Sequence, residues 1–192
     1  MPDPNPQALE FLLNRRSRPA KTLTRPVPDR EALAPILKAG LRTPDHGKLE
    51  PWRLIVLEGE AMTRLAELAQ VRGEALGLDA EKIGKGRGQF DIGNLAVAVV
   101  ESPVIAEKVP EIEQTYSAGA VCLSLLNAAL AAGWGANWLS GWPAHDRGFL
   151  TEALKLSPHE RLAGLIHIGT EKSAPPERPR PDMESKVSWV SQ

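Results

Sequence analysis

The chain has 192 residues and a formal net charge of −1, a length that fits one domain or a subunit that completes its core by dimerising. The near-neutral charge, without a separate basic run, gives no electrostatic reason to expect binding to nucleic acid or to an anionic membrane. No apolar stretch is long enough to span a bilayer and the N-terminus is not signal-like, so we expect a cytoplasmic protein in which residues 1–192 form a single domain.

A short helix is predicted from Gln7, because Leu9, Leu12 and Leu13 recur on one face and Pro19 ends the helical run. The end of this helix carries the sequence Asn-Arg-Arg-Ser-Arg at residues 14–18. Arginine guanidinium groups bind phosphate oxygens through paired hydrogen bonds, and a serine hydroxyl adds a neutral donor, so the cluster is suited to one phosphate. The alternative is a solvated helix end whose arginines only offset the helix dipole.

A polar loop at Arg42–Trp52 lies between a predicted helix, Leu33–Leu41, and a predicted strand, Trp52–Leu57. Because buried elements hold both of its ends, the loop is predicted to be a rigid binding loop. The alternative is an ordinary connection in which Asp45 begins a turn and His46 is solvated.

After this strand a third helix is predicted through Met62, Leu65 and Leu68. Residues 77–93 contain the sequence GKGRG but no preceding strand and no Walker spacing, so we interpret them as a mobile surface segment rather than a phosphate loop. A continuous apolar run at residues 94–100 then predicts a strand that is buried on both faces.

The longest helical pattern runs from Glu113 to Ala132 and is apolar around nearly its whole circumference. Such a helix is expected to be buried on all sides. Its alanines and Gly119 would let another helix approach closely, so the partner is predicted to be the same helix of a second subunit. The alternative is the central helix of a monomeric core.

A short strand opening into a loop is predicted at residues 136–143, followed by a helix at residues 146–156 and a buried strand at residues 162–168. Trp138 and Trp142 flank a Leu-Ser-Gly sequence, which suits an aromatic ligand. The alternative is that the two tryptophans belong to the core and its rim.

The histidines and the single cysteine do not indicate a metal site. His46, His145, His159 and His167 lack metal-ligand spacing, and Cys122 lies among apolar residues. We therefore expect no bound metal and no internal disulfide, with Cys122 a small core residue. His167 is predicted to be a satisfied core or sheet-edge histidine rather than a catalytic one.

The C-terminal region is predicted to be extended. Four prolines between Ser173 and Pro181 prevent regular structure, and Lys186–Val190 resembles a last short strand. A tail of this kind is suited to reach across a partner subunit.

Several segments, taken in order, resemble the nitroreductase family of flavoproteins. The resemblance covers nearly the whole chain and is closest to the short NAD(P)H nitroreductase-like subfamily, whose loop after the second helix reads Ala-Pro-Asp-His before a Pro-Trp pair. No single motif is highly specific, but the order and spacing of the motifs are. The matching segments are Asn14–Ser17, Arg42–His46 with the pair Pro51-Trp52, and Gly133–Gly141 after the alanine-rich helix.

The resemblance implies an α+β fold in which a central mixed β-sheet is flanked by helices, giving three layers. It also implies an intertwined homodimer formed largely through the long helix. A C-terminal tail of about residues 173–192 would extend onto the partner subunit and add its strand there. One FMN would bind in each of two interface clefts, with NAD(P)H as the electron donor.

The family motifs also imply which residues would bind FMN. They are Arg15, Arg16 and Ser17 for the phosphate and ribityl chain, Arg42 and His46 from the polar loop, and Trp138, Leu139 and Ser140 beside the ring. Relatives often carry arginine where this chain has Leu139, which removes one side-chain contact, and many have an asparagine where this chain has Lys48. Many relatives also hold the phosphate with a basic residue near the C-terminus, a role that the sequence does not assign to Arg178 or Arg180.

The chemistry implied by the family is hydride transfer from NAD(P)H to flavin N5 and then, by a ping-pong mechanism, to a small-molecule acceptor such as a nitroaromatic or a quinone. The cofactor performs this chemistry, so no catalytic side chain is assigned. One alternative is a flavin-binding protein without reductase turnover, a sensor or a store, which Leu139 favours. A second is a dimeric structural protein that has kept the fold and lost the ligand.

Overall fold

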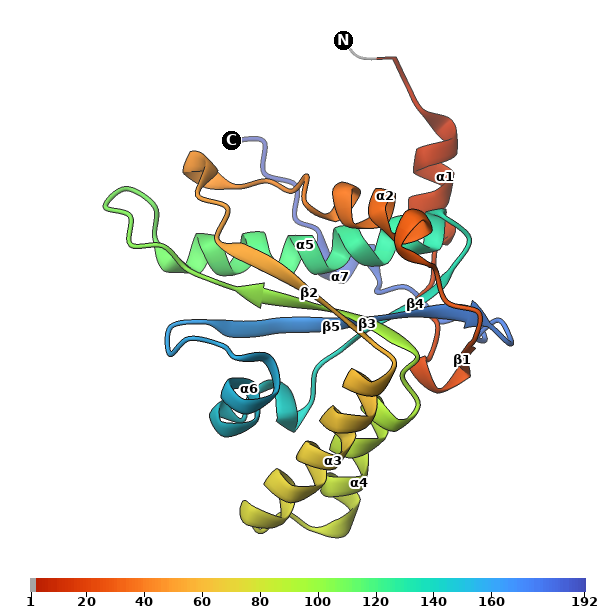
Figure 1. Ribbon diagram of the computed structural model, residues 1–192. Helices are drawn as coiled ribbons and strands as arrows, with labels where there is room; N and C mark the ends of the chain where they lie inside the picture. Colours follow the sequence, from red (N-terminus) through yellow and green to blue (C-terminus); the bar gives the residue numbers. More distant parts are fainter. Residues whose placement is uncertain (1–2) are drawn as a thin grey trace.

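The computed structural model describes residues 3–192 as helices packed on both sides of one sheet (Figure 1). The α-helices are α1 (Pro6–Asn14), α2 (Arg30–Gly40), α3 (Glu60–Ala75), α4 (Ala80–Asp91), α5 (Glu111–Ala131), α6 (Arg147–Leu154) and α7 (Met183–Lys186). The strands are β1 (Leu23–Thr24), β2 (Trp52–Glu58), β3 (Leu95–Glu101), β4 (Gly135–Leu139) and β5 (Arg161–Glu171). Helices α2 and α5 cover one face, and α3, α4 and α6 cover the other (Figure 1). The predicted α+β class, with helices flanking a central sheet, is confirmed.

The sheet is organised around β5, which pairs with β3 along one edge, with β4 along the other, and with β1 at its C-terminal end. Strand β2 completes the sheet by pairing with β3. Each of these pairings is antiparallel, so the expected mixed sheet is wrong for the single chain. A mixed sheet needs a parallel strand, and residues 3–192 of one chain supply none.

Strand β3 is buried along its whole length, as its continuous apolar sequence predicts. It lies between β2 and β5 in the sheet, with helices over both faces. Helix α5 also agrees with its predicted bounds to within two residues.

The prediction of a mobile segment at residues 77–93 is wrong, because most of it forms helix α4. The carboxylate of Asp79 caps this helix by accepting a hydrogen bond from the backbone N–H of Lys82 at 2.8 Å. Ile83, Gly86 and Phe90 are buried on one side of the helix, at helical spacing. The glycines lower helix propensity, but the burial of this side against α3 and η3 (Trp142–Ala144) outweighs that cost.

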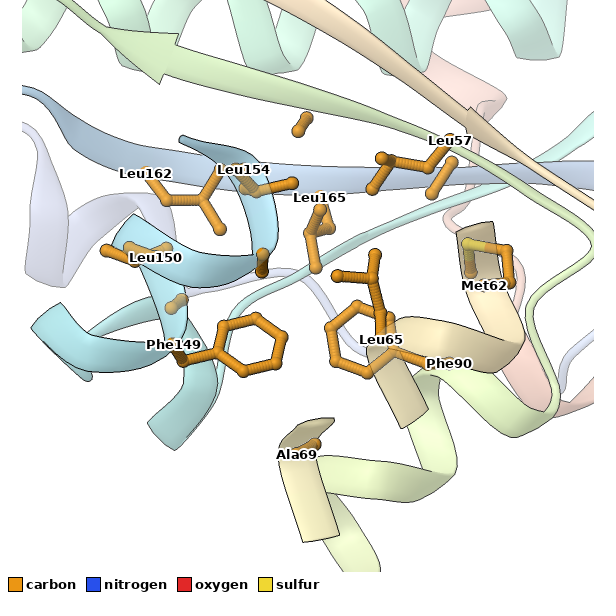
Figure 2. Close-up of a cluster of buried hydrophobic side chains, with 14 of the residues drawn as sticks. Leu57, Met62, Leu65, Ala69, Phe90, Phe149, Leu150, Leu154, Leu162 and Leu165 are labelled. Carbon is orange, nitrogen blue, oxygen red and sulfur yellow. The ribbon is translucent and has the colours of Figure 1, made fainter. Parts of the chain in front are cut away.

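Two apolar clusters lie on opposite faces of the sheet. On the α3, α4 and α6 side, the Phe90 and Phe149 rings lie 5.5 Å apart and close the cluster with Leu65 (Figure 2). On the α5 side, Val121 and Leu125 pack into a second cluster with strand residues. Each face of the sheet therefore has its own core.

Cys122 belongs to the second cluster, as predicted, and burial raises the pKa of its thiol to about 12. One side of its helix is open in the single chain, and the sequence predicts that a second subunit completes the burial of this helix. Ile112, Tyr116 and Leu123 of α5 are exposed at 53%, 67% and 45%. One chain leaves an apolar stripe along α5 open.

The predicted strand at Lys186–Val190 is wrong for the single chain. The chain there ends helix α7 and continues without regular structure. Trp189 and Val190 are among the most exposed apolar side chains, at 90% and 85%. A strand requires a neighbouring strand for its backbone hydrogen bonds, and the single chain offers none at this position.

Candidate functional site

The arginine segment after α1 is held against the sheet by hydrogen bonds on several sides. The backbone N–H of Arg18 donates to the carbonyl of Ala136 at 2.8 Å, and the Asn137 side-chain amide donates to the Arg18 carbonyl at 2.7 Å. The Arg18 guanidinium pairs with Glu171 at 2.7 Å. Residues 15–18 are thus fixed beside the start of β4 and the end of β5.

Arg15, Arg16 and Ser17 line one cavity of about 560 Å³, as their predicted common role requires. The opposite wall is the C-terminal tail, from which Arg178 and Arg180 line the same cavity. The Arg180 side chain also donates a hydrogen bond to the carbonyl of Leu13. Residues far apart in the sequence therefore bring four guanidinium groups to one place.

Two of these guanidinium groups have donors without acceptors. Arg15 Nε and Arg16 Nη1 are buried and make no hydrogen bond, although Arg16 Nη1 lies 3.3 Å from a carboxylate oxygen of the exposed Glu177. Arg15 Nη2 donates to Ser17 Oγ at 3.2 Å. Burial, followed by the charges of Arg16 and Arg18, lowers the pKa of Arg15. Such a site favours an anion with several acceptor oxygens, and a phosphate group has them.

Leu139 and Ser140 lie at the other end of β4 and line a second cavity, of about 360 Å³, together with residues of α4. From Ala136, beside the arginines, to Ser140 the strand covers about 13 Å at about 3.3 Å per residue. Trp138 points to the opposite face of the sheet, where its indole donates to the carbonyl of Ala163 at 3.3 Å. The structure therefore brings Leu139 and Ser140 together and separates Trp138 from them.

The polar loop, which the sequence predicts to be rigid, is held by several side-chain hydrogen bonds. The Trp52 indole donates to Ser117 Oγ at 3.0 Å, and that hydroxyl donates to the Pro44 carbonyl at 2.8 Å. The carboxylate of Asp45 accepts from the backbone N–H of Glu50 at 2.8 Å. Side chains of α5 and of the loop itself thus hold the loop in place.

His46 lies far from the arginine cavity in the single chain, and Arg42 does not line that cavity. His46 Nδ1 is 2.6 Å from Glu113 Oε2 in the first turn of α5, whereas Arg15 and Arg16 line a cavity with Leu130 in the last turn. From Glu113 to Leu130 the helix rises about 26 Å at about 1.5 Å per residue. His46 and the arginines therefore lie at opposite ends of α5.

His167 is buried in the core, as predicted, but it is not satisfied. Its side chain is 2% exposed, and neither ring nitrogen has a hydrogen-bond partner. Burial lowers the pKa of His167 to about 4, so the ring is neutral at pH 7.

Gln89 and Asn137 line the two cavities of the candidate site, and the sequence does not predict them. Gln89 lines the cavity with Leu139 and Ser140, and Asn137 lines the arginine cavity. The signal for Gln89 was its place beside Ile83 and Phe90 on one helical side, which went unrecognised because α4 was not predicted. Asn137 carried no signal beyond being a polar residue in a short strand.

Across residues 3–192, no cluster of three or more histidine, cysteine, aspartate or glutamate side chains has a geometry that could hold a metal ion. In the same part of the chain, every helix is too short or too polar to cross a membrane.

Comparison with known proteins gives a consistent result. Residues 12–170 match the model of the Nitroreductase family. An Escherichia coli (strain K12) protein named "Putative NAD(P)H nitroreductase YdjA" is 36% identical over 163 residues, which is 85% of this chain and 87% of the relative.

Solved structures share the fold. A nitroreductase-like family protein from Bacillus cereus superposes with a TM-score of 0.81 at 21% identity, covering 100% of both chains. A Desulfovibrio desulfuricans protein, described as a "putative nitroreductase in complex with fmn", superposes with a TM-score of 0.74 at 21% identity, covering 99% of this chain and 100% of the other. At these identities the two structures establish the fold of this chain.

Proposed function

The chain belongs to the nitroreductase family, and from that premise we propose that it is an FMN-dependent oxidoreductase. It passes a hydride from NAD(P)H through flavin N5 to a nitroaromatic, a quinone or a similar acceptor by a ping-pong mechanism. The names of the Escherichia coli relative and of the Desulfovibrio desulfuricans complex support the electron donor and the cofactor. The observation that carries the proposal is the pair of buried arginine donors, Arg15 Nε and Arg16 Nη1, that make no hydrogen bond in the cavity of Arg15 and Arg16.

This cavity binds the FMN phosphate. Arg15 and Arg16 donate from the segment fixed beside β4, and Arg178 and Arg180 complete the positive charge from the tail. Ser17 adds a neutral donor for the phosphate or the ribityl chain. In this proposal Leu139 and Ser140, which line one cavity at the other end of β4, contact the flavin ring, and Trp138 packs nearby on the opposite face of the sheet.

Arg42 and His46 reach the flavin from a second copy of the chain. The position of His46 at the far end of α5 from Arg15 supports a site shared between two subunits, because one chain alone separates these two residues. The open stripe of Ile112, Tyr116 and Leu123 supports dimerisation through α5. In a two-fold dimer with antiparallel α5 helices, the start of one α5 lies near the end of the other.

The C-terminal tail, about residues 173–192, extends onto the partner subunit of the same dimer. Its exposed Trp189 and Val190 support this proposal, since two large apolar side chains in water favour burial against a partner. The tail arginines remain in their own subunit's phosphate cavity, so the tail leaves that cavity before it crosses.

The flavin supplies the hydride chemistry, and the protein supplies binding and orientation. The arginine cavity fixes one end of the cofactor, and the loop of His46, braced by Glu113, approaches from the partner. The side chain of Leu139 cannot donate a hydrogen bond, so the contacts of this position come from its backbone. No side chain is assigned a catalytic role.

The experiment is an absorption spectrum of the purified protein before and after anaerobic addition of NADH or NADPH. We expect bound FMN with maxima of an oxidised flavin, which bleach on addition of the donor. A colourless protein that takes up no FMN would contradict the proposal. A yellow protein that neither donor bleaches would favour the second candidate, a flavin-binding protein without turnover, which Leu139 motivates.

The phosphate assignment is tested by replacing Arg15 and Ser17 together with alanine. Loss of charge-assisted hydrogen bonds to phosphate is expected to cost about 3 kcal/mol, which is about 100-fold in the Kd for FMN. Arg30→Ala is the control, because Arg30 is 94% exposed and pairs only with Glu58 at 3.7 Å. Unchanged FMN affinity in the double variant would contradict the assignment.

A further inference from the structure

The cavity between α4 and the residues after β4 has walls that are held by contacts within the chain. It measures about 360 Å³ and is lined from α4 by Lys82, Lys85 and Gln89. Its other wall ends in Trp142, whose indole N–H donates to the Lys82 carbonyl at 2.9 Å. Trp142 lies so close to Gly86 that a Cβ there would be 2.0 Å from the indole nitrogen. Contact between this tryptophan and a glycine therefore sets the width of the cavity.

Gln89 is the one polar residue of this wall that is buried and incompletely hydrogen-bonded. Its side chain is 7% exposed, and its amide nitrogen donates to the Gly86 carbonyl at 3.2 Å. Its carbonyl oxygen is buried and has no partner. A carboxamide has two N–H donors, so one donor and the carbonyl acceptor of Gln89 remain without a partner. Buried polar groups in this state are rare, and a ligand that pairs with both explains the residue.

We propose that the carboxamide of Gln89 pairs with the imide edge of the flavin ring and thereby positions the cofactor. This inference rests on the proposed function and names a further residue of the same site. The imide edge carries an N3–H donor between two carbonyl acceptors, so an adjacent donor and acceptor match it. Leu139 and Ser140, the residues proposed to lie beside the ring, line the same cavity as Gln89.

The charges around the cavity agree with this occupant. Lys82 and Lys85 provide positive charge at its rim, and their pairs with Asp79 and Glu81, at 3.0 and 2.5 Å, are exposed surface pairs that reorient easily. The imide edge of the flavin gains negative charge when the ring is reduced, and positive charge near its carbonyl oxygens stabilises that state.

The test compares FMN with N3-methyl-FMN, in which a methyl group replaces the imide hydrogen. The full-length protein and its Gln89→Leu variant are titrated with each flavin, and the Kd is read from flavin fluorescence. We expect the natural chain to bind N3-methyl-FMN about tenfold more weakly than FMN, and Gln89→Leu to bind FMN about tenfold more weakly and to lose the preference between the two. Gln70→Leu is the control, because Gln70 bonds to Glu74 on the surface of α3 and lines neither cavity of the site.

Leucine has a similar volume and removes an unpaired carbonyl, so Gln89→Leu is expected to fold, and its circular dichroism spectrum checks this. Equal affinity of the natural chain for both flavins, or a preference that survives in Gln89→Leu, would overturn the inference and leave the proposed function standing. A natural chain that binds neither flavin would overturn both. Titration of the natural chain with FMN and with N3-methyl-FMN is enough to detect equal affinity for the two flavins, even if the variant does not fold.

Discussion

The two faces of the sheet are covered in different ways. On the face of α3, α4 and α6, three aromatic rings pack together: Phe149 lies 5.5 Å from Phe90 and meets Trp142 edge-on at 6.4 Å. On the other face, α5 buries one side against the sheet and leaves Tyr116 and Leu123 exposed on its other side. One face is completed by its own chain, and the other ends in an apolar surface.

The two faces therefore differ in whether apolar side chains are buried within one chain or are open to a second subunit. The apolar cluster of the α3–α4–α6 face is packed by residues of the single chain, so substitutions in that cluster act on folding. The outer stripe of α5 is exposed in the single chain, and its burial against a partner would stabilise a dimer. Substitutions on this stripe are therefore expected to act on association. Three predictions test this division, in order of decreasing effect.

The largest effect is expected for Phe149→Ala. Phe149 is 1% exposed and touches the other two aromatic rings, so its removal leaves a cavity and lowers the free energy of unfolding by about 3–5 kcal/mol. Urea denaturation at pH 7 measures this change. Val71→Ala is the control: Val71 is 59% exposed on α3, and its truncation is expected to change stability by less than about 0.5 kcal/mol. Similar losses in both variants would mean that this face is not closed.

A second test uses His167, which lies within the same closed side next to Gly93 and Met62. Its pKa is lowered to about 4 in the folded protein, so the unfolded chain binds the proton first as the pH falls below about 6.5. The group therefore lowers the free energy of unfolding progressively between pH 6.5 and pH 4, by about 3 kcal/mol in total, and has no further effect below pH 4.

The measurement compares urea denaturation of the natural chain and His167→Leu at pH 7 and at pH 4.5. The variant is expected to lose less stability over this interval, and the exposed His159→Leu serves as the control. Equal losses in the natural chain and His167→Leu would show that water reaches the ring.

The third test concerns the α5 stripe. Leu123→Asp is expected to weaken association by about 2 kcal/mol, or about 30-fold in the dimer Kd, because it places a charge in the proposed interface. Sedimentation equilibrium measures the Kd, and circular dichroism checks that the subunit stays folded. Val71→Asp is the matched control, since it adds the same charge to an exposed apolar position outside the stripe. An unchanged Kd in Leu123→Asp would place the interface elsewhere.

Much of the fold followed from periodicity. The strands β3 and β5 and the helix α5 were predicted because their apolar patterns are long and uninterrupted. Helix α4 was not, because Gly84, Gly86 and Gly88 interrupt the apolar pattern between its buried residues Ile83 and Phe90. At Gly86 the reason is a contact with Trp142, more than fifty residues later, which local propensity cannot register.

The candidate site likewise has residues that the sequence could predict and residues that it could not. Arg15, Arg16 and Ser17 are neighbours in the sequence, so their common cavity was predictable from the motif. Gln89 and the tail arginines reach the site only through packing between distant segments, so composition and spacing could not assign them. The separation of His46 from the arginines follows from the length of α5 and becomes visible only in three dimensions.

Helix α1 buries none of its residues, whereas the segment that follows it is bonded to β4 and β5 through Arg18. Local unfolding of α1 can therefore occur at small free-energy cost without releasing the arginines from the sheet. In a hydrogen-exchange experiment, the backbone amides of α1 would exchange early. The backbone amide of Arg18 would exchange as slowly as the amides of β4 and β5. The anchoring point of the candidate site is thus energetically independent of the helix that leads into it.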